Sequence, residues 1–208
     1  MTPMDRLADG LAALGFASAD MDAFALYMSE LQRWNRTHNL IGPATEAEIV
    51  ERHLLDSALY ARVLAEIGAR EIVDVGAGAG LPGVPVGLLL PDSRVTMIEP
   101  RAKRAAFLRI LSGKLGRSYS VIESRAEDAP AMHADAAVTR ALFAAHEFAR
   151  ICAHLVRPGG VFVLSKGSRA GAETAALTQP HRTVKAAIPG TRITRTLILV
   201  DNAQEESR

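Results

Sequence analysis

The sequence predicts an α/β fold in which helices cover both faces of a mostly parallel, seven-stranded sheet, with a helical extension at the N-terminus. From residue 70 onwards, short apolar strand patterns alternate with helical patterns, which is typical of parallel sheets. The first strand pattern runs directly into a glycine-rich turn, and the first 68 residues show no strand-like alternation. We therefore predict one globular unit, in which an extension over residues 1–68 packs on a core over residues 69–208.

The extension is expected to form three helices. The first covers residues 4–14. The second is amphipathic, is capped by Ser18 or Asp20 and ends near residue 36. Thr45 and Glu48 have the spacing of a capping box, which predicts a third helix that continues to Gly68.

The core is expected to contain seven strands. They are predicted over residues 72–75, 94–99, 119–123, 134–139, 161–165, 183–187 and 195–200. Helices are predicted to begin near Pro82 and to cover residues 103–115 and 142–156, the last ending at the sequence RPGG. Pro189 and Gly190 separate the last two strands, so the chain is expected to close with an antiparallel pair.

Composition is compatible with a cytoplasmic enzyme or binding protein. The chain has 208 residues, of which 49% are hydrophobic and 23% charged, enough for one α/β domain and a modest extension. The single cysteine, Cys152, excludes an internal disulfide and is expected to be a core residue, which fits a reducing cytosol. No segment approaches the roughly 20 apolar residues that span a bilayer, and no signal peptide is expected, so the predicted location is the cytoplasm.

Basic residues are concentrated after the extension. Residues 1–70 contain six Lys or Arg against ten Asp or Glu, which leaves eighteen basic and thirteen acidic residues for the remainder. No acid lies between Pro100 and Ile122, where the basic residues are Arg101, Lys103, Arg104, Arg109, Lys114 and Arg117. Such a run is either a solvated face or a surface for a phosphate backbone.

The stretch EIVDVGAGAGLPG, residues 71–83, indicates a nucleotide-type ligand. One interpretation is GxGxxG from Gly78, the dinucleotide fingerprint, with Glu99 at the distance of a ribose-binding acid. The other starts at Gly76 and includes the strand-end acid Asp74. A pyrophosphate disfavours a neighbouring carboxylate, whereas the cationic sulfonium and ammonium of S-adenosyl-L-methionine (AdoMet) favour one. Asp74 therefore favours AdoMet.

Further polar residues follow later strands at the same carboxyl edge of the sheet. Residues 124–127, SRAE, are placed to frame an adenine, while Arg140 and Lys166 end two strands and predict an anionic substrate. On the third helix, His53 and Asp56 share one face, a spacing more typical of a helix-surface hydrogen bond or an inward histidine than of a catalytic dyad. No metal-ligand spacing is present, and no metal is expected.

Several of these motifs occur together in one known family. They are Asn39-Leu40, RHLLDS (52–57), DVGAGAGLPGVP (74–85), Lys103-Arg104 with Phe107-Leu108, SRAE (124–127), Thr139-Arg140-Ala141 and Lys166-Gly167. In this combination the chain resembles the RsmG (GidB) family of bacterial small-subunit rRNA methyltransferases over roughly residues 20–200. The resemblance implies a Rossmann-like class I AdoMet-dependent methyltransferase fold and methylation of guanine N7 in the 530 loop of 16S rRNA.

The resemblance also implies roles for individual residues. Cofactor contacts are implied at Gly76, Gly78, Leu81, Glu99, Ala126, Glu127 and Arg140, beside the Asp74 carboxylate. Positions associated with activity or RNA are Asn39, His53, Asp56, Arg125, Arg140 and Lys166. The expected partner is 16S rRNA, the 30S subunit or an assembly intermediate, and the protein is expected to be a monomer.

Guanine N7 already carries an in-plane lone pair, so methyl transfer to it requires alignment and exclusion of water but no general base. The lack of a compelling catalytic dyad is therefore compatible with this activity. Two alternatives remain open, namely a non-catalytic AdoMet-sensing RNA-binding protein and a small-molecule methyltransferase. The basic run argues against the second.

Overall fold

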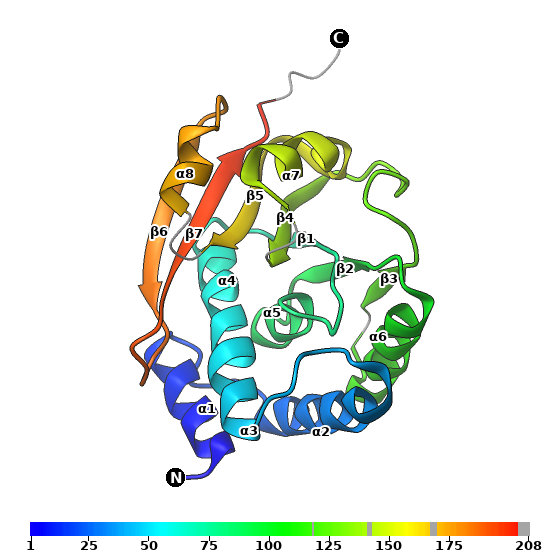
Figure 1. Ribbon diagram of the computed structural model, residues 1–208, viewed down its shortest axis with the longest axis vertical. Helices are drawn as coiled ribbons and strands as arrows, with labels where there is room; N and C mark the ends of the chain where they lie inside the picture. Colours follow the sequence, from blue (N-terminus) through cyan, green and yellow to red (C-terminus); the bar gives the residue numbers. More distant parts are fainter. Residues whose placement is uncertain (118, 141–142, 167–169, 204–208) are drawn as a thin grey trace.

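The computed structural model describes residues 1–117, 119–140, 143–166 and 170–203. Its centre is a seven-stranded sheet with the order β3-β2-β1-β4-β5-β7-β6 (Figure 1). The strands are β1 (Glu71–Val75), β2 (Arg94–Ile98), β3 (Ser120–Ile122), β4 (Ala134–Arg140), β5 (Val156–Lys166), β6 (His181–Ala187) and β7 (Thr194–Asp201). Strands β1 to β5 pair in parallel, and β7 runs antiparallel to both β5 and β6. The predicted sheet and its antiparallel end are confirmed.

The helices cover both faces of this sheet. They are α1 (Pro3–Ala13), α2 (Met21–His38), α3 (Glu46–Ile49), the π-helical turn η1 (Val50–Leu54), α4 (Leu55–Glu66), α5 (Gly83–Leu89), α6 (Ala102–Leu115), α7 (Ala145–Ile151), the 3-10 turn η2 (Ala153–Leu155) and α8 (Ala170–Ala175). One buried cluster joins α1, α2, α4 and α5 to the sheet side chains of Ile72 and Val163. A second joins α7 to Val73 and Phe162. Neighbouring strand residues thus face different layers.

The third predicted helix is not continuous. Its capping box is present, because the Thr45 hydroxyl accepts the Glu48 N–H and the Glu48 carboxylate accepts the Thr45 N–H. The five residues of η1 then interrupt the α-helix between α3 and α4. A π-helical turn keeps helical backbone angles, so a hydrophobic pattern does not reveal it, and such turns are frequent at functional sites. Here the turn carries Arg52 and His53.

The predicted helix over residues 142–156 was too long. Its start at Leu142 lies outside the described residues, and β5 already begins at Val156. The β4–β5 register shifts from Ala134↔Val156 to Ala136↔Val161, so the RPGG sequence forms a bulge inside the strand. A Cβ atom on Gly160 would lie 2.8 Å from the carbonyl oxygen of Asp135, so only glycine fits there. RPGG is therefore a strand bulge and not a helix end.

Helix α4 fixes the carboxyl ends of β4 and β5 through Tyr60. The buried Tyr60 hydroxyl donates to the carbonyl oxygen of Thr139 at 2.9 Å and accepts the N–H of Ser165 at 2.8 Å. This hydroxyl therefore sets the positions of the residues that follow, Arg140 and Lys166.

We predict that Tyr60→Phe lowers the free energy of unfolding by about 2 kcal/mol, because a buried carbonyl and a buried N–H both lose their partner. Urea denaturation measures this. Tyr119→Phe is the control, since the Tyr119 hydroxyl is only partly buried and donates one bond, to the carbonyl oxygen of Val84. It should cost about 1 kcal/mol or less. Equal losses in the two variants would contradict the bridging role of Tyr60.

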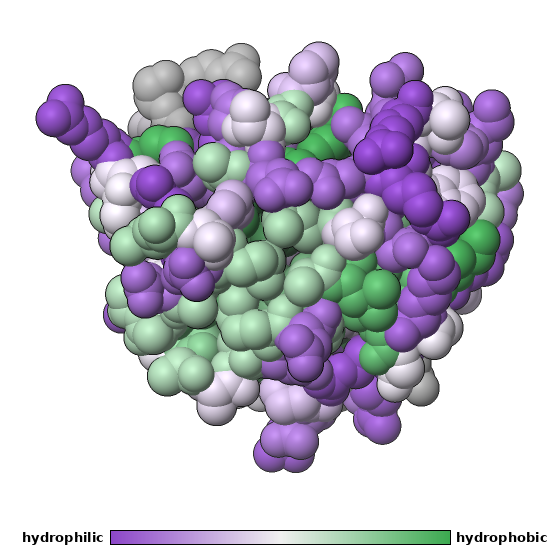
Figure 2. Space-filling model, turned by 90° about the horizontal axis from the view of Figure 1, so that it is seen from below, coloured by the Kyte–Doolittle hydropathy of each residue, from purple (hydrophilic) through white to green (hydrophobic). Residues whose placement is uncertain are grey.

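The side of the molecule at the lower end of Figure 1 is weakly hydrophobic. Helices α1 and α2 lie there and carry exposed alanines such as Ala12, Ala13 and Ala25. Figure 2 views this side and shows pale green residues across its centre, with hydrophilic residues towards the margins. Within the described residues, no helix is both long enough and apolar enough to cross a membrane.

Candidate active site

The glycine loop after β1 is built from left-handed backbone. Gly76, Gly78 and Gly80 have φ values of 70°, 58° and 84°, which L-residues with a Cβ rarely adopt. The N–H groups of Gly76 and Ala77 donate to the carbonyl oxygen of Ile98, at 2.8 and 3.1 Å, so the loop turns over the end of β2. Because these glycines lack a Cβ, the backbone can approach a ligand closely at this edge.

Asp74 lies beneath the loop and is fully buried. Its Oδ2 accepts the Gly83 N–H at 2.8 Å, which ties the end of β1 to the start of α5. Its Oδ1 has no hydrogen-bond partner among the described residues. Burial is the main cause that raises the pKa of this carboxyl to about 7. A carboxylate with an unused buried oxygen fits a cationic ligand group.

Glu99 follows β2 and is also buried, at 3% exposure. Its Oε2 accepts the N–H of Gly78 at 2.8 Å, and its Oε1 accepts the N–H of Arg101 at 3.0 Å. A carboxylate oxygen can accept a second hydrogen bond. Glu99 can therefore hold the loop and still accept two hydroxyl groups, as the ribose of AdoMet would require.

A cavity of about 400 Å³ opens beside the loop. Its lining residues are Val75, Gly76, Ile98, Pro100, Arg101, Arg125, Ala126, Glu127 and Phe143. Gly76, Ala126 and Glu127 are among the predicted cofactor contacts. The walls combine apolar side chains with polar groups from three loops, which fits an adenosine-sized ligand. Leu81, by contrast, is 4% exposed and packs in the core, away from this lining.

Five lining residues were not predicted as site residues. Val75 and Ile98 are the last residues of β1 and β2, and the others are Pro100, Arg101 and Phe143. Pro100 and Arg101 directly follow Glu99, so their place after a strand end was a usable signal. Phe143 stacks on Phe148 of α7, with ring centroids 5.9 Å apart. Nothing in a single sequence indicates that contact.

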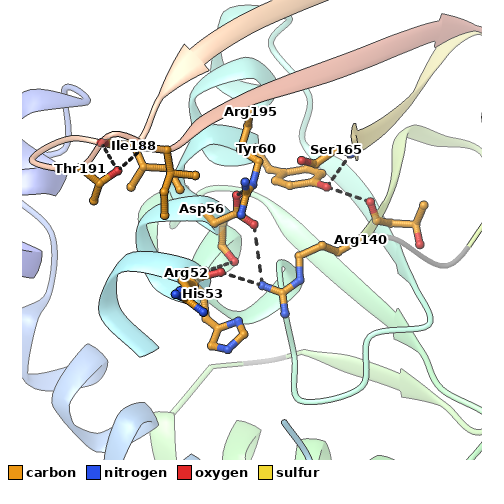
Figure 3. A network of polar contacts seen from close by, with 12 residues as sticks. Arg52, His53, Asp56, Tyr60, Arg140, Ser165, Ile188, Thr191 and Arg195 are labelled. Atoms are coloured by element: carbon orange, nitrogen blue, oxygen red, sulfur yellow. Dashed lines mark hydrogen bonds and ion pairs between the residues drawn. The ribbon is translucent and has the colours of Figure 1, made fainter. Parts of the chain in front are cut away.

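A polar network lies at the end of β4 (Figure 3). Asp56 of α4 is buried between two arginines. The Nε of Arg195, on β7, donates to Oδ1 at 2.7 Å, and the Nη1 of Arg140 lies 3.8 Å from Oδ2. The Arg140 Nη1 also donates to the carbonyl oxygen of Arg52 at 3.5 Å. The structure thus brings together the predicted Asp56 and Arg140, and it adds Arg195, which belongs to no motif in the sequence.

His53 lies beside this network and is neutral at physiological pH. Burial, followed by the charges of Arg140 and Arg52, lowers the pKa of His53 to about 4. Its Nδ1 is buried without a hydrogen-bond partner among the described residues. His53 is therefore suited to hydrogen bonding as a neutral ring and not to holding a positive charge.

Arg140 and Lys166 share an edge of the sheet but lie on opposite faces. Arg140 pairs with Ser165 in the parallel register, so the next residue, Lys166, faces the other layer. Lys166 Nζ donates to the carbonyl oxygen of Phe143 at 2.5 Å and pairs with Glu173 at 3.2 Å. A ligand that contacts both cations must extend across the edge. Ala141 and Gly167 of the same motifs lie outside the described residues.

The other two predicted polar residues lie at the surface. The Arg125 side chain is 73% exposed and is 3.9 Å from Glu127. Asn39 is exposed and ends α2 in a left-handed conformation, with φ of 47°, which asparagine tolerates better than most residues. The structure does not bring Asn39 into the network of Asp56 and Arg140.

A larger cavity, about 580 Å³, lies at the amino end of the strands, lined in part by Asp135, Arg157 and Asn202. The polar atoms of these side chains already make hydrogen bonds within the protein. Asp135 accepts two backbone N–H groups and Arg157, while Asn202 donates to the carbonyl of Val156. Ligands of parallel α/β sheets bind at the carboxyl ends of the strands, so we assign the site to the smaller cavity. No group of His, Cys, Asp or Glu within the described ranges is arranged to hold a metal ion.

Comparison with solved structures gives the same fold. A magnesium protoporphyrin IX methyltransferase from Synechocystis, solved with bound AdoMet, covers 96% of this chain and 97% of its own at a TM-score of 0.58 and 15% identity. A putative caffeoyl-CoA O-methyltransferase from Staphylococcus aureus covers 83% and 91%, with a TM-score of 0.58 and 12% identity. The Rossmann-like class I methyltransferase fold is confirmed.

Sequence relatives cover nearly the whole chain. Proteins named ribosomal RNA small subunit methyltransferase G are 36% identical in Stenotrophomonas maltophilia, over 93% of this chain and 92% of theirs, and 34% identical in Nitrosospira multiformis, over 98% and 99%. The GidB family, described as rRNA small subunit methyltransferase G, matches residues 20–191. The chain therefore belongs to the GidB family of small-subunit rRNA methyltransferases, and AdoMet is its cofactor.

Proposed function

We propose that this protein methylates N7 of a guanine in the 530 loop of 16S rRNA. Membership of the GidB family, over residues 20–191, is the observation that carries the proposal. The site geometry supports it, because the glycine loop, Glu99 and the adjoining cavity fit AdoMet, while Arg140 lies at the neighbouring strand end. We further propose that the protein acts as a cytoplasmic monomer on the 30S subunit or an assembly intermediate.

The residues of the chain hold and align the reactants. Gly76, Gly78, Glu99, Ala126 and Glu127 would hold AdoMet, which supplies an electrophilic methyl group when bound. The buried Asp74 would face its cationic part. Guanine N7 has a lone pair and no proton to remove, so the reaction needs no general base. His53, which is neutral, would therefore serve as a polar contact and not as an acid or base. Arg140, whose side chain is 23% exposed, would donate to the RNA side of the site.

Ion pairs reduce the number of basic residues that are available to contact RNA phosphates. Arg109 pairs with Glu123 at 2.9 Å and Lys114 with Glu30 at 2.6 Å, so two of the four basic residues of α6 already have an acidic partner. Among the described acids, none lies within ion-pair distance of Arg101, Lys103 or Arg104 at the start of α6. These three residues, of which Arg101 lines the cofactor cavity, are the proposed phosphate contacts.

Methyl transfer from labelled AdoMet tests the proposal. We expect incorporation into 16S rRNA within 30S particles, with borohydride and aniline cleavage mapping the new N7-methylguanine to the 530 loop. Label at another base would overturn the position while keeping the activity. Transfer to metabolites but not to RNA would identify a small-molecule methyltransferase, and AdoMet binding without any transfer would favour a non-catalytic RNA-binding protein.

A further inference from the structure

Asp56 is a buried carboxylate shared unequally by two arginines. Asp56 is 3% exposed. Arg195 makes a hydrogen-bonded ion pair with it at 2.7 Å, whereas Arg140 stays 3.8 Å away, beyond hydrogen-bond distance. Figure 3 shows the two guanidinium groups approaching Asp56 from different strands. The carboxylate therefore has one tight partner and one loose partner.

Arg140 is correspondingly held by weak contacts. Besides Asp56, it contacts the carbonyl oxygen of Arg52, at the long distance of 3.5 Å. A guanidinium has five N–H donors. Most donors of Arg140 are thus available to a ligand, although a buried carboxylate lies close by.

Arg195 is placed by a well-defined turn. It is the second residue of β7 and pairs with Ala186 of β6. Two hydrogen bonds close the connecting turn. The Ile188 N–H donates to the carbonyl oxygen of Ile193, and the Thr191 hydroxyl donates to the carbonyl oxygen of Ile188. The position of Arg195 is therefore set by the β6–β7 hairpin and does not depend on Arg140.

We propose that Arg195 is a positioning residue that occupies Asp56 and thereby keeps Arg140 free for the substrate. This inference rests on the proposed function, in which Arg140 faces RNA. Without Arg195, the buried carboxylate would have Arg140 as its nearest cation. Because an unpaired buried carboxylate is costly and bidentate arginine–carboxylate pairs are strong, Asp56 would then draw Arg140 into a tight pair.

The electrostatics of Asp56 agree with this view. Burial raises the pKa of the Asp56 carboxyl, and the charge of Arg195 is the largest effect in the opposite direction, ahead of that of Arg140. Arg195 is thus the main group that keeps Asp56 ionised, and Arg140 contributes less. The two arginines are not interchangeable partners.

Three variants test the proposal, namely Arg195→Met, Asp56→Asn and the double variant. We expect Arg195→Met to lower kcat for rRNA methylation about tenfold, and the double variant to be at least about threefold more active than Arg195→Met, since no carboxylate then competes for Arg140. A double variant no more active than Arg195→Met would contradict competition for Arg140. If Arg195 only stabilises the fold, Arg195→Met lowers the free energy of unfolding, because Asp56 is left unpaired, but kcat per folded enzyme stays within about threefold of wild type. Either result would overturn the proposal.

Two further variants separate charge from packing. Arg195→Lys keeps the charge and should remain within about threefold of wild type. If Arg195→Met does not fold, a tenfold loss in Arg195→Lys that Asp56→Asn fails to relieve would overturn the proposal. Arg62→Met is the matched control. Arg62 lies on α4, as Asp56 does, but it pairs with Glu66 at the surface.

A crystal structure of Arg195→Met distinguishes this inference from the proposed function. If wild type transfers no methyl group to RNA, the proposed function fails. The inference is then decided by the Arg140–Asp56 distance, which should shorten from 3.8 Å to a hydrogen-bonded pair. An unchanged Arg140 would overturn the inference even if the enzyme methylates RNA.

Discussion

Replacement of Glu99 by alanine is expected to weaken AdoMet binding about a hundredfold, which corresponds to about 3 kcal/mol. Two effects add. The N–H groups of Gly78 and Arg101 lose the carboxylate that accepts them at 2.8 and 3.0 Å, so the glycine loop is no longer held in the binding conformation. The proposed ribose hydroxyls lose their acceptor as well. Isothermal titration with AdoMet measures the change.

Glu123→Ala is the matched control for this experiment. Glu123 follows β3 on the same side of the sheet, but it is exposed and pairs with Arg109 at the surface. Its loss should leave AdoMet affinity unchanged. An affinity for Glu99→Ala within twofold of wild type would show that Glu99 does not hold the cofactor. A parallel titration of wild type with NAD tests the dinucleotide interpretation of the loop, which requires tight NAD binding without AdoMet binding.

The features that the sequence predicts well are those encoded locally. The glycines of the loop need left-handed backbone, and Asp74 and Glu99 each end a strand whose apolar pattern is clear. Parallel strands place such ends at one edge, so the cofactor side of the site follows from spacing alone. The capping box of Thr45 and Glu48 was predictable for the same reason, because its two hydrogen bonds lie within four residues.

The features that it does not predict depend on contacts distant in sequence. The pair of Asp56 and Arg195 joins residues 139 positions apart. The RPGG bulge depends on its fit against β4, and a proline–glycine pattern is equally typical of a helix end. Lys166 faces away from Arg140 because of the β4–β5 register, and a sequence does not predict a strand register to within one residue.

The stability of the protein is expected to fall with rising pH because of Asp74. Its pKa is raised from the ordinary value of 3.8 to about 7 by burial, the largest cause. Above pH 3.8 the unfolded chain has lost this proton, whereas the folded protein keeps it until about pH 7. The unfolded state therefore binds fewer protons, and the free energy of unfolding decreases by about 2.5 kcal/mol between pH 5 and pH 8.

Asp74→Asn isolates this effect. Asparagine keeps an oxygen for the Gly83 N–H but does not ionise, so its stability relative to wild type should increase by about 2.5 kcal/mol from pH 5 to pH 8, measured by urea denaturation. Asp135→Asn is the control. Burial raises the pKa of Asp135, but hydrogen bonds from the N–H groups of Glu71 and Arg70 and from Arg157 lower it overall. Its contribution is therefore constant above pH 5, and its difference from wild type should not change.

The ionisation of Asp74 should also make AdoMet affinity depend on pH. If the ionised Asp74 faces the cationic part of AdoMet, binding releases the Asp74 proton, and AdoMet affinity should rise about tenfold from pH 6 to pH 8. Asp74→Asn should remove this dependence. A wild-type affinity that does not change over this range, together with the stability difference described above, would mean that Asp74 only ties β1 to α5 through the Gly83 N–H. The two measurements thus show whether Asp74 only stabilises the fold through the Gly83 N–H or also contacts the cofactor.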